Sequence, residues 1–254
     1  MPPIRNLLLA SLPLRTAQDL LAQLTPVHLA FGQVLYERGQ PMRAVYFPVE
    51  GLVSLLALVG DRNALEVAMV GREGMVGIPL ALGVSRSPMR ALVQGGGTGL
   101  RMSRTRFDTA MRRSPPLRKV LLEYASALMG QIAQTAACNR FHVVEARLAR
   151  WLLMTRDRAG SDDLAVTQEF LSSMLGVRRV GISEAASAFQ RSKLIEYSRG
   201  RIRILDHAGL EAACCTCYRD EPAALPSWRP APPAPLATPM APKNSLTGRV
   251  SGST

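Results

Sequence analysis

Three scarcities in this 254-residue sequence exclude several classes of protein. Aromatic residues make up only 5%, there are only four cysteines, and no hydrophobic run is long. The longest apolar stretches, such as residues 55–59, fall far short of the ~18–20 residues that span a bilayer, so we predict no membrane segment. Hydrophobic residues still make up 47%, too many for a disordered chain. The length allows one large or two small domains with a real core.

The beginning of the chain lacks the features of an export signal. Residues 7–14 are apolar, but Pro13 interrupts them, and charged residues follow at Arg15 and Asp19. Helical spacing of apolar residues continues to Leu24. This pattern predicts an amphipathic helix rather than a signal peptide, and therefore a cytoplasmic protein.

Lysine is also scarce, which affects how the charge is interpreted. Only three of the 31 basic residues are lysines, and with 19 acidic residues the net charge is +12. A genome that favours arginine codons explains such an excess as well as a nucleic-acid partner does. The position of the charge is therefore more informative than its total.

Cysteine and histidine are too few and too scattered to predict a catalytic site. Cys138 stands alone on a predicted helix, whereas Cys214, Cys215 and Cys217 form a cluster near the end of the folded part. This cluster could bind a metal or respond to oxidation, but no histidine follows it at ligand spacing. We therefore predict reduced thiols, with no metal and no cofactor. No nucleophile–base pattern or nucleotide-binding motif is present either, so we predict no enzyme activity; the histidines are His28, His142 and His207.

The first half of the chain reads as short strands separated by turns. The β-prone segments are residues 34–36, 44–47, 52–59, 65–70 and 91–93. Glycine and proline punctuate them at near-regular spacing, which is typical of an antiparallel sandwich or barrel. We predict an α+β protein in which residues 1–114 form an antiparallel β-barrel of the jelly-roll (double-stranded β-helix) type. Residues 221–254 hold eight of the 18 prolines and are predicted to be a disordered tail, with Trp228 as its one possible anchor.

A long helix is predicted for residues 115–140, opened by two prolines that are tolerated in a first helical turn. Two apolar stripes run along it, and we expect one to pack on the chain's own β domain and the other on a second copy. We assign the dimer contact to the stripe with alternating steps of four and three, as in a coiled coil. That stripe comprises Leu117, Leu121, Tyr124, Leu128, Gln131 and Thr135. A helix buried inside one subunit is the alternative.

Residues 164–205 give the strongest signal, within a predicted third domain at 141–220. Thr167 suits an N-cap, and Gly176 suits the tight turn between that helix and a second one that ends near Gln190. Two alternating segments then follow, 194–197 and 201–205, with a turn at Ser198-Arg199-Gly200. This order predicts a helix-turn-helix followed by a β-hairpin wing.

The charge of this unit suits DNA. Residues 178–203 hold seven basic and two acidic side chains, which gives +5 in 26 residues. An arginine can donate two hydrogen bonds to guanine in the major groove, and a glutamate can accept one from cytosine. We predict base contacts from Arg178, Arg179, Ser183 and Glu184. We predict backbone contacts from Thr167, Arg199, Arg201 and Arg203. The alternative is a solvated helical face beside a charged hairpin.

The order of β-barrel, long helix and winged helix-turn-helix resembles the Crp/Fnr family of bacterial transcription regulators. The matching stretches are 145–153, 167–179 and 194–202, with a looser match at 36–41 and 46–51. The resemblance implies a cyclic-nucleotide-binding-like domain, a homodimer paired through the long helix, palindromic promoter sites on double-stranded DNA, and RNA polymerase as a partner. The family's base-contacting arginine matches Arg179, but Val180 and Glu184 depart from its pattern, so a different target sequence is expected.

The effector pocket departs further from the family. Gly77 and Arg90 match it and are our candidate pocket residues. Ile78 stands where a carboxylate is expected, and Ala91 offers no hydroxyl. A site without its hydrogen-bonding partners rejects the ligand that needs them, so we predict an unidentified effector or a mere scaffold. A cyclic-nucleotide-responsive regulator and an interaction module without sequence-specific DNA binding are the alternatives.

Overall fold

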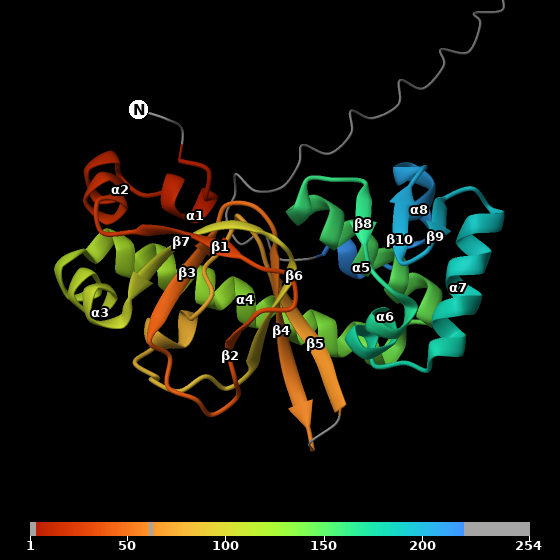
Figure 1. Ribbon diagram of the computed structural model, residues 1–254, viewed down its shortest axis with the longest axis horizontal. Helices are drawn as coiled ribbons and strands as arrows, with labels where there is room; N and C mark the ends of the chain where they lie inside the picture. Colours follow the sequence, from red (N-terminus) through yellow and green to blue (C-terminus); the bar gives the residue numbers. More distant parts are fainter. Residues whose placement is uncertain (1–3, 61–62, 221–254) are drawn as a thin grey trace, which may run out of the picture.

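The computed structural model describes residues 4–60 and 63–220, and the tail predicted at 221–254, with Trp228, lies outside the described residues. Two lobes lie side by side, and one long helix, α4 (Pro115–Phe141), runs behind the first and reaches the second (Figure 1). Among the described residues, no helix is long and apolar enough to cross a membrane.

The first lobe is built on two antiparallel sheets. One sheet consists, in spatial order, of β1 (Thr25–Leu29), β7 (Gly97–Ser103) and β3 (Ala44–Pro48). The other consists of β2 (Val34–Tyr36), β6 (Arg90–Gly95), β4 (Leu52–Val59) and β5 (Asn63–Val70). Phe47 and Met102 of the first sheet and Val53 and Val93 of the second are fully buried in one core. The predicted α+β class with an antiparallel N-terminal part is confirmed.

Helices and short turns complete this lobe. Pro13 divides the predicted N-terminal helix, since Pro13 itself is the N-cap of the second piece. The elements are α1 (Leu7–Ala10), α2 (Leu14–Leu21), the 3-10 turn η1 (Ile78–Leu80) and α3 (Arg104–Arg113). Asn6 fixes the start of α1, because its side-chain amide donates to Pro48 and Gly74 carbonyls at 2.8 and 3.1 Å while its oxygen accepts from the Leu9 amide.

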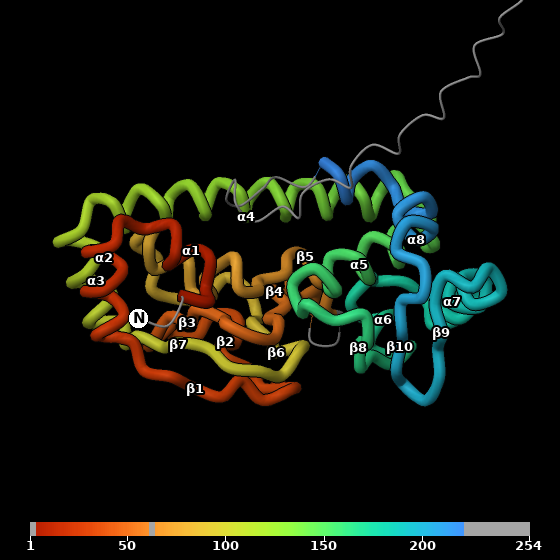
Figure 2. Tube along the Cα trace, turned by 90° about the horizontal axis from the view of Figure 1, so that it is seen from above, coloured from red at the N-terminus to blue at the C-terminus, as the bar shows by residue number. Residues whose placement is uncertain are grey.

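Helix α4 lies along most of the length of the molecule, with most of both lobes on one side of it (Figure 2). The stripe that we assigned to the dimer contact faces this inner side. Five of its six members are buried within the single chain: Leu117, Leu121, Tyr124, Leu128 and Gln131. The sixth, Thr135, accepts hydrogen bonds from Arg150 of the same chain at 3.4 Å. The structure therefore corrects this assignment, because the first lobe's own core takes up the stripe.

The second lobe is a three-stranded antiparallel sheet covered by helices. Its elements are α5 (Val144–Ala159), β8 (Asp163–Ala165), α6 (Gln168–Leu175), α7 (Arg179–Arg191), β9 (Ile195–Ser198), β10 (Arg201–Ile204), α8 (His207–Ala213) and η2 (Thr216–Tyr218). The strands are ordered β8-β10-β9. Leu152, Leu171, Ile182 and Ile202 are fully buried at the centre of this lobe.

The two lobes share an apolar contact through β4. Val53 and Leu55 point into the core of the first lobe, whereas Leu52 and Leu56 belong to the core of the second. Side chains alternate between the faces of a strand, so β4 is buried on both sides. That is why its sequence is almost uninterruptedly apolar rather than alternating.

Candidate nucleic-acid interface

Helices α6 and α7 form a helix-turn-helix whose start and turn are set by local chemistry. The Thr167 hydroxyl accepts a hydrogen bond from the Phe170 amide at 3.1 Å, which satisfies one of the free N–H groups at the start of α6. Gly176 ends α6 with φ 61° and ψ 38°, in the left-handed region that glycine adopts readily. The chain turns at once, and α7 begins at Arg179 with Arg178 as its N-cap.

One face of α7 is buried and the other is exposed. Ile182, Ala185 and Phe189 pack into the lobe at 0–5% exposure. Arg179 and Glu184 lie on the exposed side, together with Arg178, Val180 and Ser187. The N-terminal end of a helix concentrates free N–H groups, which favours anions such as phosphate. Arg178 and Arg179 are therefore exposed at the end of α7 whose free N–H groups also attract phosphate.

The wing is a tight hairpin between β9 and β10. Ser198 pairs with Arg201, which leaves a two-residue loop. Both loop residues have positive φ, 48° for Arg199 and 77° for Gly200. A type I′ turn requires positive φ at both positions, and its twist matches that of the flanking strands. The turn leaves the Arg199 and Arg201 side chains exposed.

A groove of about 420 Å³ separates α6, the start of α7 and the wing. Thr167, Arg179 and Arg199 all line it, so one surface brings together three predicted contacts from three segments of the sequence. Gln168, Glu169 and the hairpin residues 197–200 complete its walls. The surface offers hydroxyl and guanidinium donors on both sides of a channel, which suits the phosphates and base edges of a nucleic acid.

Besides Thr167, two of the predicted contacts already have side-chain partners within the chain. The Ser183 hydroxyl donates to Oε1 of Gln168 at 2.7 Å and so joins α7 to α6. The Arg203 Nε lies 2.8 Å from Oδ1 of Asp163 on the neighbouring strand, and the hydrogen bond to that carboxylate raises the pKa of Arg203. Sequence reasoning missed both Gln168 and Asp163, because neither pairing is local. Arg203 is therefore a weaker candidate for DNA than Arg199 or Arg201.

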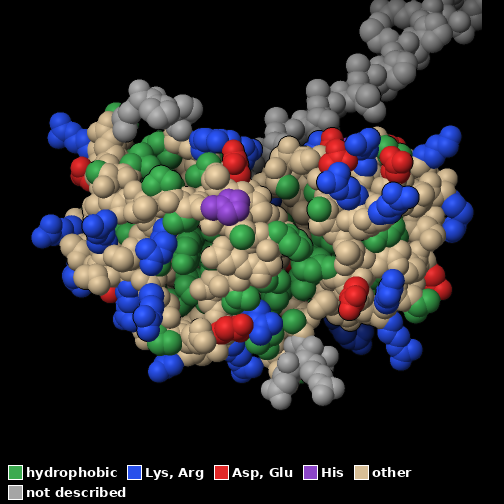
Figure 3. Space-filling model, in the orientation of Figure 1, with side chains coloured by type: hydrophobic (Ala, Val, Ile, Leu, Met, Phe, Trp, Pro, Cys, Tyr) green, Lys and Arg blue, Asp and Glu red, His purple; other side chains and the backbone are tan. Residues whose placement is uncertain are grey.

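The surface charge is not confined to this lobe. Figure 3 shows blue lysine and arginine side chains spread over both ends of the visible face. This distribution agrees with a general enrichment in arginine. The local arrangement around the groove, rather than the net charge of +12, marks the interface.

The two candidate effector residues of the first lobe, Gly77 and Arg90, do not line a common cavity. Gly77, with φ 101°, lines an apolar cavity of about 20 Å³ beside Tyr36, Met42 and Ile78. Such a cavity has room for about one water molecule. Arg90 does not line it, since its Nε pairs with Oε2 of Glu37 at 2.9 Å.

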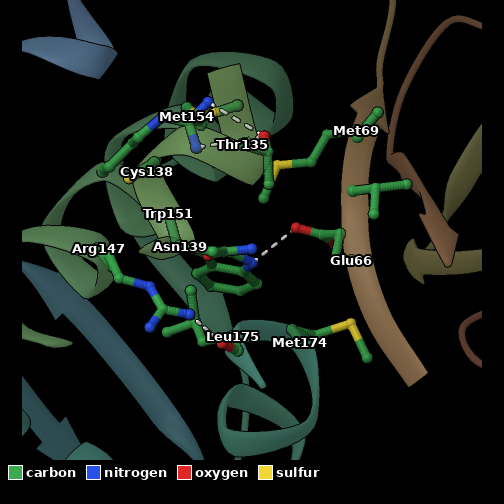
Figure 4. A pocket seen from close by; sticks show the side chains of 13 residues that line it. Glu66, Met69, Thr135, Cys138, Asn139, Arg147, Trp151, Met154, Met174 and Leu175 are labelled. Atoms are coloured by element: carbon green, nitrogen blue, oxygen red, sulfur yellow. Dashed lines mark hydrogen bonds between the residues drawn. The ribbon is translucent and has the colours of Figure 1, made fainter. Parts of the chain in front are cut away.

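A second small cavity, again of about 20 Å³, lies between the lobes (Figure 4). Figure 4 shows Glu66 of β5 pointing toward Trp151 of α5, whose indole Nε1 donates to Oε1 at 2.9 Å. Burial raises the pKa of Glu66 to about 7 despite hydrogen bonds from Ser54 and Trp151 and the nearby Arg158 and Arg150 charges. Its signal in the sequence is a single acidic residue inside the apolar strand Asn63–Val70.

Two family models match the chain in chain order. A cyclic nucleotide-binding domain matches residues 26–114, and a Crp-like helix-turn-helix domain matches residues 146–213. The chain belongs to the Crp/Fnr family. It is a DNA-binding transcription regulator of that type.

Solved structures share the fold of this Crp/Fnr regulator at low sequence identity. FixK2 from Bradyrhizobium japonicum is 15% identical, with a TM-score of 0.65, and the match covers 76% of this chain and 98% of that one. The c-di-GMP-responsive global regulator CLP from Xanthomonas campestris is 16% identical, with a TM-score of 0.63 and coverage of 76% and 100%. A Crp/Fnr regulator from Thermus thermophilus is 23% identical, with a TM-score of 0.60 and coverage of 74% and 97%. No curated protein sequence matches the chain significantly.

Proposed function

We propose that this Crp/Fnr regulator binds palindromic sites on duplex DNA as a homodimer and reads base edges with the start of α7. The observation that carries this proposal is the groove that gathers Thr167, Arg179 and Arg199 beside an exposed helix N-terminus. Arg178 and Arg179 are assigned to base edges together with Glu184, and Arg199 and Arg201 to phosphates. Ser183 is assigned to holding α7 on α6.

The outer side of α4 supports the homodimer. A second seam with steps of four and three runs along that side, and all of its members are exposed: Leu122, Ser126, Met129, Ala133 and Ala136. Leu122 and Met129 are 45% and 60% exposed, which is unusual for such large apolar side chains at the centre of a helix face. Small residues at the other positions let two helices approach closely. Pairing here would give the dimer two symmetric copies of α7, as two half-sites about one DNA turn apart require.

The first lobe is proposed to act as a scaffold, or as a sensor of an effector other than a cyclic nucleotide. The cavity at Gly77 is far smaller than a nucleotide, and Arg90 is paired with Glu37. Calorimetric titration with cyclic AMP, cyclic GMP and cyclic di-GMP should show no binding; one tight binder would overturn the scaffold assignment.

We further propose that the protein acts in the cytoplasm, without enzymatic activity, and with RNA polymerase as its partner at promoters.

Selection of binding sites from random duplex DNA tests the function directly. We expect a single palindromic motif to be enriched. Arg179→Ala should lose about 1–3 kcal/mol on that motif and much less on random DNA. Arg191→Ala, at the far end of the same helix, is the matched control and should keep the preference. If no motif is enriched, the helix-turn-helix serves packing, and the interaction-module alternative holds instead.

A further inference from the structure

Four potential metal ligands from distant parts of the sequence converge beside the end of α4. Cys138 lies in the last turn of α4, and His142 caps the C-terminal end of that helix. Cys215 and Cys217 follow α8, on either side of Thr216. The three sulfur atoms and one imidazole nitrogen all lie within 4.8 Å of one another. Sequence reasoning looked for a histidine after the cysteine cluster and so missed one that lies well before it in the chain.

Two of the six separations between these atoms match the edges of a tetrahedron around one zinc ion. The Cys138 and Cys215 Sγ atoms are 3.6 Å apart, and the Cys217 Sγ lies 3.5 Å from His142 Nδ1. Zinc bonds of about 2.3 Å to sulfur and about 2.0–2.1 Å to nitrogen place tetrahedral ligands about 3.8 Å apart for two sulfurs. For a sulfur and a nitrogen the same geometry gives about 3.5 Å. A multinuclear iron–sulfur cluster would hold its ligands farther apart.

Backbone and side-chain contacts hold this arrangement in place. The His142 amide donates to the Cys138 carbonyl at 3.1 Å, which fixes the two helix-end ligands relative to each other. On the other side, the Tyr218 hydroxyl donates to Oδ2 of Asp157 at 2.7 Å and ties the Cys217 segment to α5. The four ligands are buried or half-buried. The arrangement thus joins α4, the junction between α4 and α5, and the segment after α8.

Charge in the neighbourhood also suits a metal. Three thiolates and a divalent cation leave one net negative charge. Arg147 and Arg150 line the same small cavity as Cys138, and both are at least nine-tenths buried. Buried guanidinium groups are stable beside a compensating negative charge and costly without one.

We propose that Cys138, His142, Cys215 and Cys217 bind one zinc ion in tetrahedral coordination. The set is a closed Cys₃His site with four protein ligands, which is the pattern of structural rather than catalytic zinc. The ion fastens the end of the DNA-binding lobe to the long helix. Cys214 lies next to the site, but its sulfur points to the Ala146 carbonyl at 3.8 Å and is not a ligand.

The test uses the full chain purified under reducing conditions. Elemental analysis should give one zinc per chain. After removal of zinc with a chelator, Co²⁺ should produce the thiolate charge-transfer band and intense visible bands of tetrahedral coordination, and Zn²⁺ should abolish them. Cys138→Ser, His142→Ala, Cys215→Ser and Cys217→Ser should each lose the bound zinc. The matched controls, Cys214→Ser and His207→Ala, should retain it.

Thiol labelling of the wild-type chain decides the question even if the variants fail to fold. Zinc should protect three of the four cysteines from a thiol-reactive reagent, and its removal should expose them. Three outcomes would overturn the proposal: no metal bound by the reduced protein, a disulfide joining Cys138 to Cys215 in its place, or an iron–sulfur chromophore with acid-labile sulfide.

Discussion

Replacing Glu66 by glutamine tests how the two lobes are held together. Glu66 is 6% exposed and accepts a hydrogen bond from Trp151 across the lobe boundary. Glutamine has nearly the same shape and keeps an oxygen that can accept this bond, but it cannot ionise. Comparison of the two proteins therefore isolates the effect of a buried charge at this position.

The magnitude follows from the pKa of Glu66, which burial raises from an ordinary 4.5 to about 7. Below about pH 4.5 the folded and unfolded states both hold the proton, so the carboxyl group costs nothing. Between about pH 4.5 and 7 the unfolded chain ionises while the folded chain keeps its proton, so the free energy of unfolding falls as pH rises. Above about pH 7 the loss is complete at about 3 kcal/mol, because one pKa unit corresponds to about 1.4 kcal/mol.

Urea unfolding from about pH 4 to pH 8, at one fixed protein concentration, measures this difference. Trp151 fluorescence reports on the contact itself, provided that both proteins carry Trp228→Phe. We expect Glu66→Gln to match the parent near pH 4 and to exceed its stability by about 3 kcal/mol near pH 8. Glu169→Gln, an exposed change on α6, should have little effect at either pH. A difference that is independent of pH, or a glutamine variant less stable at pH 8, would refute the reasoning.

Three further predictions concern DNA binding, assembly and stability. Arg201→Ala should weaken binding to all duplexes alike and reduce the magnitude of the slope of log affinity against log salt concentration by about one. An unchanged slope would show that Arg201 does not contact phosphate. Met129→Asp should shift the protein from dimer to monomer in sedimentation while Lys119→Ala, on the same helix, leaves it dimeric; a dimeric Met129 variant would place the contact elsewhere. Glu73→Ala should cost about 3–5 kcal/mol in urea unfolding, because it removes the carboxylate from an ion pair with Arg158 whose partners are each 2% exposed. A loss under about 1 kcal/mol would show that Arg158 finds another partner.

Local sequence patterns predicted many elements correctly. They missed a strand whose glycines are required by close contact with a neighbouring backbone segment. The apolar run of β4 has the predicted bounds, and α4 begins at the predicted residue, Pro115. Strand β7 was missed, because its glycines read as a turn. A side chain at Gly97 would meet the Glu50 backbone at 2.5 Å, so glycine is needed for a close approach within the sheets. The sequence shows the glycine but not the neighbour that requires it.

Periodicity also left the orientation of α4 undetermined. Steps of four and three fit the stripe that includes Leu121 and Leu128, and they fit the stripe that includes Leu122 and Met129 equally well. Polarity does not separate them, since both are largely apolar. What separates them is the first lobe, whose core buries Leu121 and Leu128. Only a three-dimensional arrangement shows which stripe is left for a second copy.

The contacts that position the DNA-binding lobe were the least predictable, and their chemistry explains why. Trp151 and Arg158 of α5 reach carboxylates 85 positions earlier, and Cys138 meets Cys215 across 77 positions. Such polar pairs leave no periodic trace, because each joins two single residues that lie far apart in the sequence. These polar pairs also depend on direction, so a displacement of one lobe along the other would break them. An apolar contact such as that of β4 tolerates small displacements, whereas these pairs do not. We therefore expect the ionisable groups at this junction, together with the proposed zinc site, to fix the orientation of α7 relative to α4.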